Sequence, residues 1–198
     1  MDGFDIIVAG IVATTAMVLV MEAIHRMGWA NADMVRAVGS IFTRSDHGAF
    51  GIGLTVHYLM GILFAFAYTF ILSIAPIYSF KAVVILSTTM GMVHGMVVGL
   101  LITIFVAEHH PLPRFREGGA GVVIAHKIGH DVYGVVLGLT LGLLGSPVAR
   151  LSGADAVPVQ EILGYSLVWI LLFGVPLLFL ACNCLPWVKR WRTGHETL

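Results

Sequence analysis

The sequence predicts an all-α protein, a polytopic bundle of five transmembrane helices with its N-terminus outside and its C-terminus in the cytoplasm. Three observations lead to this fold class. The 198-residue chain is 58% hydrophobic and only 11% charged, whereas soluble domains are about half apolar and a quarter charged. Five apolar runs reach the ~20 helical residues that a bilayer core requires. Finally, the basic residues gather on one side of those runs.

The predicted spans together form one transmembrane domain over residues 1–198, at residues 6–27, 50–75, 82–107, 120–144 and 162–185. Each should be a helix, because lipid offers no partner for backbone polar groups. The first span does not resemble a cleavable signal peptide. Its leading residues "MDGFD" are acidic, and its apolar stretch exceeds the ~7–15 residues of a signal core.

Orientation follows from the basic residues, which are enriched in cytoplasmic loops. Eight of them follow the first, third or fifth span: Arg26, Arg36, Arg44, Arg114, Arg116, Lys189, Arg190 and Arg192. Only Lys81 and Arg150 fall in the loops on the other side. The first cytoplasmic loop contains "NADMVRAVGSIF", whose apolar residues have helical spacing, and this predicts a short amphipathic helix on the membrane surface.

Ionisable residues within the spans lie almost entirely in their cytoplasmic halves, where "AHKIGHDVYG" (residues 125–134) is the densest stretch. His126 and His130 are four residues apart and share a helix face, and Lys127 can pair with Asp131 along the same helix. Other spans contribute Glu22, His25, His57, His94 and Glu108 at the same level. Because ionisable groups in membranes are expensive and generally functional, we expect one shared polar pocket.

Imidazole with carboxylate suits iron, copper or zinc, so the first hypothesis is a metal site, with a redox-related role. The predicted ligands are His57, His94, His126 and His130, followed by Glu22 and His25. Groups that would orient those ligands are Asp131, Tyr133 and Glu108, with Glu22 as a further candidate. Glu22 and His25 have the Glu-x-x-His spacing of di-iron bundles, but this motif occurs once rather than twice, which argues against a standard di-iron centre.

A second hypothesis is a b-type haem held by His94 and His130, with small residues on both helices leaving a groove for the porphyrin edge: Gly91, Gly95, Gly99, Gly134, Gly138 and Gly142. The same spacing is typical of close helix packing, within the chain, in a homo-oligomer or with other membrane subunits. Further alternatives are an accessory subunit of a larger membrane complex without its own chemistry, and an ion or proton transporter.

"ATTAMVLVME" in the first span and "HDVYGVVLG" in the fourth resemble segments of small bacterial inner-membrane proteins of the YagU-like kind. The matching positions in the fourth span are His130, Tyr133 and Gly134. The resemblance implies a multi-pass protein of the bacterial cytoplasmic membrane and implies no activity. His126 and the pair of Glu22 and His25 are not part of it.

Several functional classes are disfavoured by the sequence. It contains no Gly-rich phosphate loop, no Gly-x-Ser-x-Gly elbow and no His-Glu-x-x-His motif, so no enzyme class is assigned. The formal net charge is zero, and no basic stripe with interleaved aromatic residues predicts nucleic-acid binding. The expected surroundings are therefore the lipid bilayer and other membrane proteins.

Overall fold

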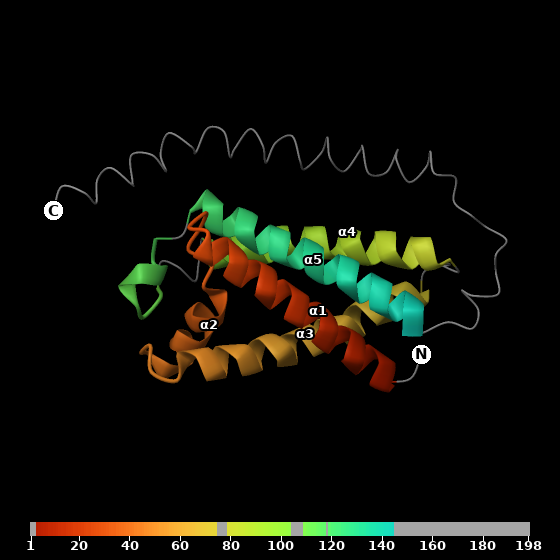
Figure 1. The fold of residues 1–198 in the computed structure, drawn as a ribbon, viewed down its shortest axis with the longest axis horizontal. Helices are drawn as coiled ribbons and strands as arrows, with labels where there is room; N and C mark the ends of the chain where they lie inside the picture. Colours follow the sequence, from red (N-terminus) through yellow and green to blue (C-terminus); the bar gives the residue numbers. More distant parts are fainter. Residues whose placement is uncertain (1–2, 75–78, 104–108, 118, 145–198) are drawn as a thin grey trace. The chain divides into compact units, whose positions relative to one another are not determined.

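The computed structural model describes residues 3–74, 79–103, 109–117 and 119–144. These residues form helices α1 (Gly3–Arg26), α2 (Met34–Thr43), α3 (Ala49–Ile74), α4 (Phe80–Leu101) and α5 (Ala120–Leu144), with a 3₁₀ turn at Pro113–Phe115 (Figure 1). No strand occurs among them. Four of these helices, α1, α3, α4 and α5, are long and apolar enough to cross a membrane, which confirms a helical multi-pass membrane protein.

The helix bounds agree closely with four predicted spans; α4 is described as far as Leu101, and residues 104–107 of the predicted third span lie outside the described residues. The predicted span at 162–185 lies outside the described residues. Contacts divide the chain into two units, Met1–Asp155 and Ala156–Leu198. All described residues belong to the first unit, so a single domain over the whole chain stays a prediction.

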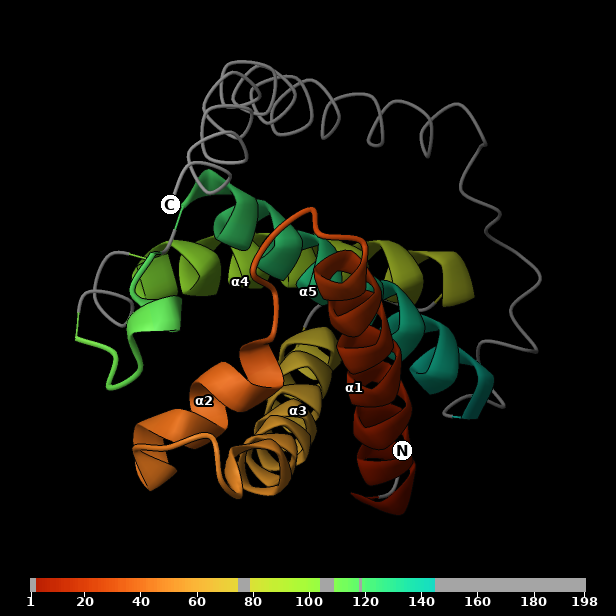
Figure 2. The same cartoon turned by 60° about the vertical axis from the view of Figure 1, so that its left-hand side comes forward.

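Helix α2 is present at the predicted amphipathic stretch, but its buried side packs against α3 (Figure 2). The Asp33 side chain caps its first turn by accepting a hydrogen bond from the Arg36 amide, which satisfies one of the free N–H groups at a helix start. The helix ends at Arg44, which has a left-handed backbone conformation. Of the predicted apolar face, Met34 and Val35 are buried, whereas Phe42 is 65% exposed.

The four long helices form a bundle in which α1 packs on both α3 and α5, while α4 packs mainly on α5. By contrast, α3 and α4 share far fewer contacts than these pairs. The outer faces of α3 and α4 carry exposed apolar residues, including Leu59, Leu63, Phe70 and Val97. Such faces are suited to lipid rather than water.

The glycines of α4 face α5 within the chain. A Cβ atom built on Gly91 would lie 2.4 Å from the carbonyl oxygen of His130, and one on Gly95 would lie 2.6 Å from the Cβ of His130. Glycine therefore allows the two backbones to approach closely, as small residues do in membrane bundles. The predicted groove on this face is filled by α5, and assembly with other subunits through it stays a prediction without support from the described residues.

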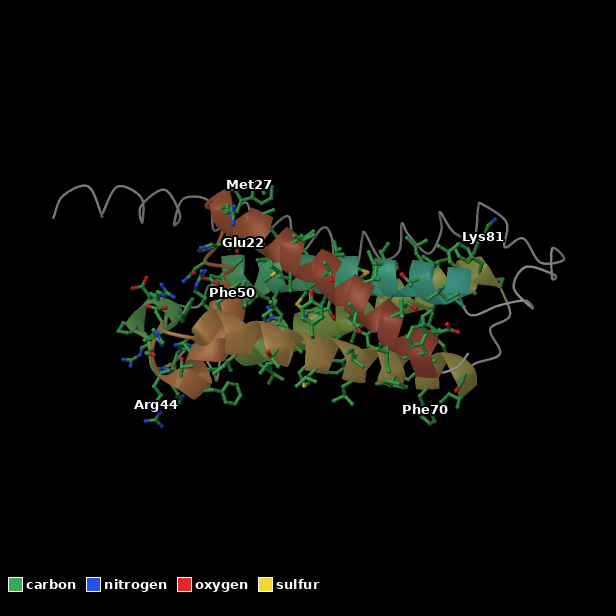
Figure 3. The ribbon with its side chains drawn as sticks, turned by 60° about the horizontal axis from the view of Figure 1, so that its bottom comes forward. Glu22, Met27, Arg44, Phe50, Phe70 and Lys81 are labelled. Atoms are coloured by element: carbon green, nitrogen blue, oxygen red, sulfur yellow. The ribbon has the colours of Figure 1, made fainter. Side chains whose placement is uncertain are left out.

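Polar side chains gather at one end of the bundle, around the start of α3 and the neighbouring turns (Figure 3). Arg44 and Glu22 lie at this end, and Lys81 lies at the other end. Arg114 forms an ion pair with Asp46 there, which links the loop before α5 to the loop before α3. The bundle therefore has one strongly polar end and one nearly uncharged end among the described residues.

Candidate functional site

The structure brings four of the predicted histidines to one cavity of about 230 Å³. His57 comes from α3, His94 from α4, and His126 and His130 from α5. Met17 of α1 and apolar residues of α2, α3 and α4 complete the walls. His126 and His130 both reach the cavity because residues four apart lie on one face of a helix, and this face of α5 points into the bundle. His57 lies on the inward face of α3.

The imidazole rings form a continuous chain of contacts. The ring centroids of His94 and His130 are 4.4 Å apart, and those of His126 and His130 are 4.9 Å apart. The ring of Phe64 lies 4.0 Å from that of His94. These contacts place the three rings of α4 and α5 within reach of a common small ligand.

Two of the histidines have their Nδ1 atoms held by hydrogen bonds. Nδ1 of His57 lies 2.8 Å from the carbonyl oxygen of Gly53. Because a carbonyl only accepts, Nδ1 of His57 must carry the proton, and Nε2 of the neutral ring then has a free lone pair. Nδ1 of His94 lies 3.0 Å from the hydroxyl of Tyr68. Such bonds to the second ring nitrogen are the usual way in which metal-binding histidines are oriented.

The other two histidines have an unsatisfied nitrogen in the bundle. The Nδ1 atoms of His126 and His130 are buried and have no hydrogen-bond partner among the described residues. His126 is only 6% exposed. Since buried polar atoms are nearly always paired with protein or water, these two nitrogens are available to a polar partner in the cavity.

Two tyrosines support the cluster. Tyr133 is almost fully buried, lines the cavity and donates a hydrogen bond to the carbonyl oxygen of Gly61 at 2.5 Å. Its ring also contacts that of Tyr68, at 5.9 Å between centroids. Tyr133 therefore ties α5 to α3, as well as standing next to His130.

Sequence reasoning missed Tyr68, Phe64 and Met17. A signal for the first two exists, because His57, Gly61, Phe64 and Tyr68 follow one another at intervals of four, three and four residues on α3. Residues at these intervals share one helix face. No comparable signal marks Met17, whose place beside the histidines depends on how α1 packs on α3 and α5.

The remaining predicted residues are not brought to this cavity. Glu22 forms an ion pair with Arg26 at 2.6 Å on the exposed side of α1, and His25 does not line the cavity. Asp131 pairs with Lys127, as predicted. Glu108 lies outside the described residues. Among the residues that are described, no group of three or more His, Cys, Asp or Glu side chains is placed so that it could hold a metal ion.

Two smaller cavities adjoin the main one. A space of about 10 Å³ lies between three methionines and three of the histidines: Met17, Met21, Met34, His57, His126 and His130. A cavity of about 140 Å³ lies near the polar end and includes Asn31, His110 and Glu117 in its lining. It shares Val38 and Ile102 with the histidine cavity, so the two cavities are neighbours at these residues.

No protein-family model, curated protein or solved structure matches this chain. The resemblance to YagU-like proteins therefore stays a prediction.

Proposed function

We propose that this membrane protein binds one metal ion through His57, His94, His126 and His130. The observation that carries the proposal is the convergence of these side chains on one buried cavity, with the Nδ1 atoms of two of them already held by Gly53 and Tyr68. Four imidazoles from three helices have no evident packing role, whereas an isolated buried histidine often has one.

The ring spacing fits ligands of a single ion. With metal–nitrogen distances of about 2.0–2.1 Å, two imidazoles on one tetrahedral ion have ring centroids roughly 5 Å apart. The observed separations in the cluster are 4.4 and 4.9 Å. In the described residues, the imidazole nitrogens of these histidines do not converge on one point. Binding would therefore require the rings of His126 and His130, whose Nδ1 atoms have no hydrogen-bond partner among the described residues, to rotate about χ2, a torsion that is broad for histidine.

A metal ion is favoured over haem b on two counts. Imidazoles on opposite sides of a haem iron would have centroids about 6 Å apart, given metal–nitrogen bonds of about 2 Å, whereas His94 and His130 are 4.4 Å apart. The cavity of about 230 Å³ is also smaller than the ~300–1,000 Å³ typical of pockets for organic ligands. The haem alternative predicts a coloured protein with a Soret band, which distinguishes it directly.

We further propose that the cluster lies in the cytoplasmic half of a bacterial inner membrane, with the N-terminus outside. Support comes from the polar end of the bundle, where Arg36, Arg44 and Arg114 gather, because short cytoplasmic loops are enriched in such residues. The cavity at that end, which shares Val38 and Ile102 with the histidine cavity, would then be the side from which an ion enters.

The test is the metal content of the full chain purified from membranes without a metal-binding tag. We expect near-stoichiometric iron, copper or zinc, lost in His126→Ala and His130→Ala but retained in the matched control His47→Ala, whose residue is exposed in a loop. Helix content and thermal unfolding in detergent show whether each variant is folded. A folded, metal-free wild-type protein would overturn the proposal and favour the accessory-subunit or proton-transporter alternatives.

A further inference from the structure

We propose that the ion is cuprous copper, Cu(I), and that the thioether sulfurs of Met17 and Met60 join the histidines as its ligands. This inference rests on the proposed metal-binding function and narrows it to one class of ion. It starts from the methionines around the cluster, of which sequence reasoning made no use.

Methionines from three helices surround the histidines. Met17 of α1 lines both the main cavity and the small one beside it, and Met60 of α3 lines the main cavity. Met21 and Met34 line the small cavity, which also borders three of the histidines. The sulfur of Met21 lies against Gly129 on α5, 2.7 Å from the position that a Cβ would take there, and Gly129 directly precedes His130.

The groups in these two cavities that could bind a metal are neutral: imidazole nitrogens and soft thioether sulfurs. Among the residues that the structure describes, no aspartate or glutamate lines either cavity. Glu22 and Asp131 instead form ion pairs with Arg26 and Lys127. Thioether ligands select Cu(I), whereas carboxylates suit magnesium, calcium and manganese. Imidazole alone accepts copper, zinc, iron and nickel, so it is the methionine sulfurs that discriminate among these ions.

The charge of the ion also favours Cu(I) over a divalent metal. A divalent ion held only by neutral ligands would carry its full +2 charge into an apolar bundle. The cost of moving an ion into a low-dielectric medium scales with the square of its charge, so a monovalent ion has roughly a quarter of that cost. Because no carboxylate of the described part of the chain lines the two cavities, Cu(I) is the candidate ion that leaves the smallest uncompensated charge there.

Methionine is also a common filler of irregular cores, and Met17 and Met21 belong to the apolar core of the bundle. Replacement of methionine by leucine distinguishes a packing role from a metal-binding role. Exchange of methionine for leucine conserves volume and usually costs less than about 1.5 kcal/mol of stability, but it removes the sulfur. Met17→Leu and Met60→Leu therefore preserve packing while deleting the proposed ligands.

The experiment uses the full chain in detergent, stripped of metal and kept under anaerobic, reducing conditions. Cu(I) and Zn(II) are titrated separately in competition with chromophoric chelators of known affinity. We expect Cu(I) to bind more tightly than Zn(II), with sulfur detected next to copper by X-ray absorption. Loss of a group that merely orients a ligand costs 10–100-fold in affinity, so the Met17→Leu/Met60→Leu double variant should lose at least about tenfold for Cu(I) and little for Zn(II).

The matched control is Met27→Leu, since Met27 follows α1 and is 54% exposed; it should bind Cu(I) like the wild type. If the double methionine variant also binds Cu(I) like the wild type, while His126→Ala and His130→Ala abolish binding, the copper-thioether inference is wrong and the histidine site stands. If the wild-type protein binds neither ion and also contains no metal when purified from membranes, both the inference and the proposed function fail.

Discussion

Replacement of Gly91 by alanine tests whether the close contact between α4 and α5 sets the geometry of the bundle. The added Cβ would lie 2.4 Å from the carbonyl oxygen of His130 and 3.1 Å from the Cα of Gly134. Both neighbours are backbone atoms, so no side-chain rotation can relieve the clash. The two helices must therefore separate.

The size of the effect follows from that displacement. A relaxed carbon–oxygen contact is about 3.3 Å, so the helices have to move apart by roughly 0.9 Å. A gap of this size forfeits a quarter to a half of the dispersion energy of each contact, and overpacking of this kind costs about 1–3 kcal/mol. Alanine returns up to about 1 kcal/mol through its higher helix propensity. We expect Gly91→Ala to lower the free energy of unfolding by about 1–2 kcal/mol.

The assay is unfolding in mixed micelles of a mild detergent and dodecyl sulfate, followed by circular dichroism. The matched control is Gly51→Ala, because a Cβ at Gly51 of α3 would meet no atom within 4 Å. This control should be neutral or slightly stabilising through the same gain in helix propensity. If Gly91→Ala proves as stable as Gly51→Ala, α4 and α5 are not in the close contact described and the reasoning is refuted.

Two further predictions concern polar groups inside the bundle. Tyr68→Phe removes the hydroxyl that holds Nδ1 of His94 and should weaken metal binding about 10–100-fold with helix content unchanged; unchanged affinity in a chelator competition would show that the tyrosine does not orient His94. Lys127→Met leaves the half-buried carboxylate of Asp131, which is 28% exposed, without its partner. It should cost about 1–3 kcal/mol of unfolding free energy. The Lys127→Met/Asp131→Leu double variant should recover most of that loss, because removing both charges of a pair inside the protein is often neutral. Equal stability of the single and double variants would contradict this account.

The helices were predictable because hydropathy and length are local properties, and a segment in lipid must satisfy its own backbone. The grouping of His57, His94, His126 and His130 was predictable too. Depth along each span fixes their level, and the helical repeat fixes which of them share a face. Both quantities can be counted directly in the sequence.

Ion pairs and contacts between helices could not be predicted in the same way, because each side chain has several partners within reach. Glu22 was a predicted ligand, yet it pairs with Arg26 one turn along α1, since a charged partner on the same helix is always within reach, whichever way the helix packs. Met17 gave no such signal. Its proximity to the histidines is set by the rotation of α1 in the bundle, which hydropathy does not determine.

The glycines of α4 connect the packing of the bundle to its proposed chemistry. In the sequence they were compatible with a haem groove and with helix packing. In the structure, Gly91 and Gly95 lie against the backbone and Cβ of His130, and His94 is adjacent to Gly95. The same lack of side chains that lets α4 and α5 touch also brings the rings of His94 and His130 to 4.4 Å. A variant that separates the helices by about 0.9 Å, as worked out above from the relaxed carbon–oxygen contact, should therefore weaken metal binding as well as stability, although Gly91 contacts no ion. Loss of stability without any loss of affinity would mean that the histidines find their ion independently of the helix contact.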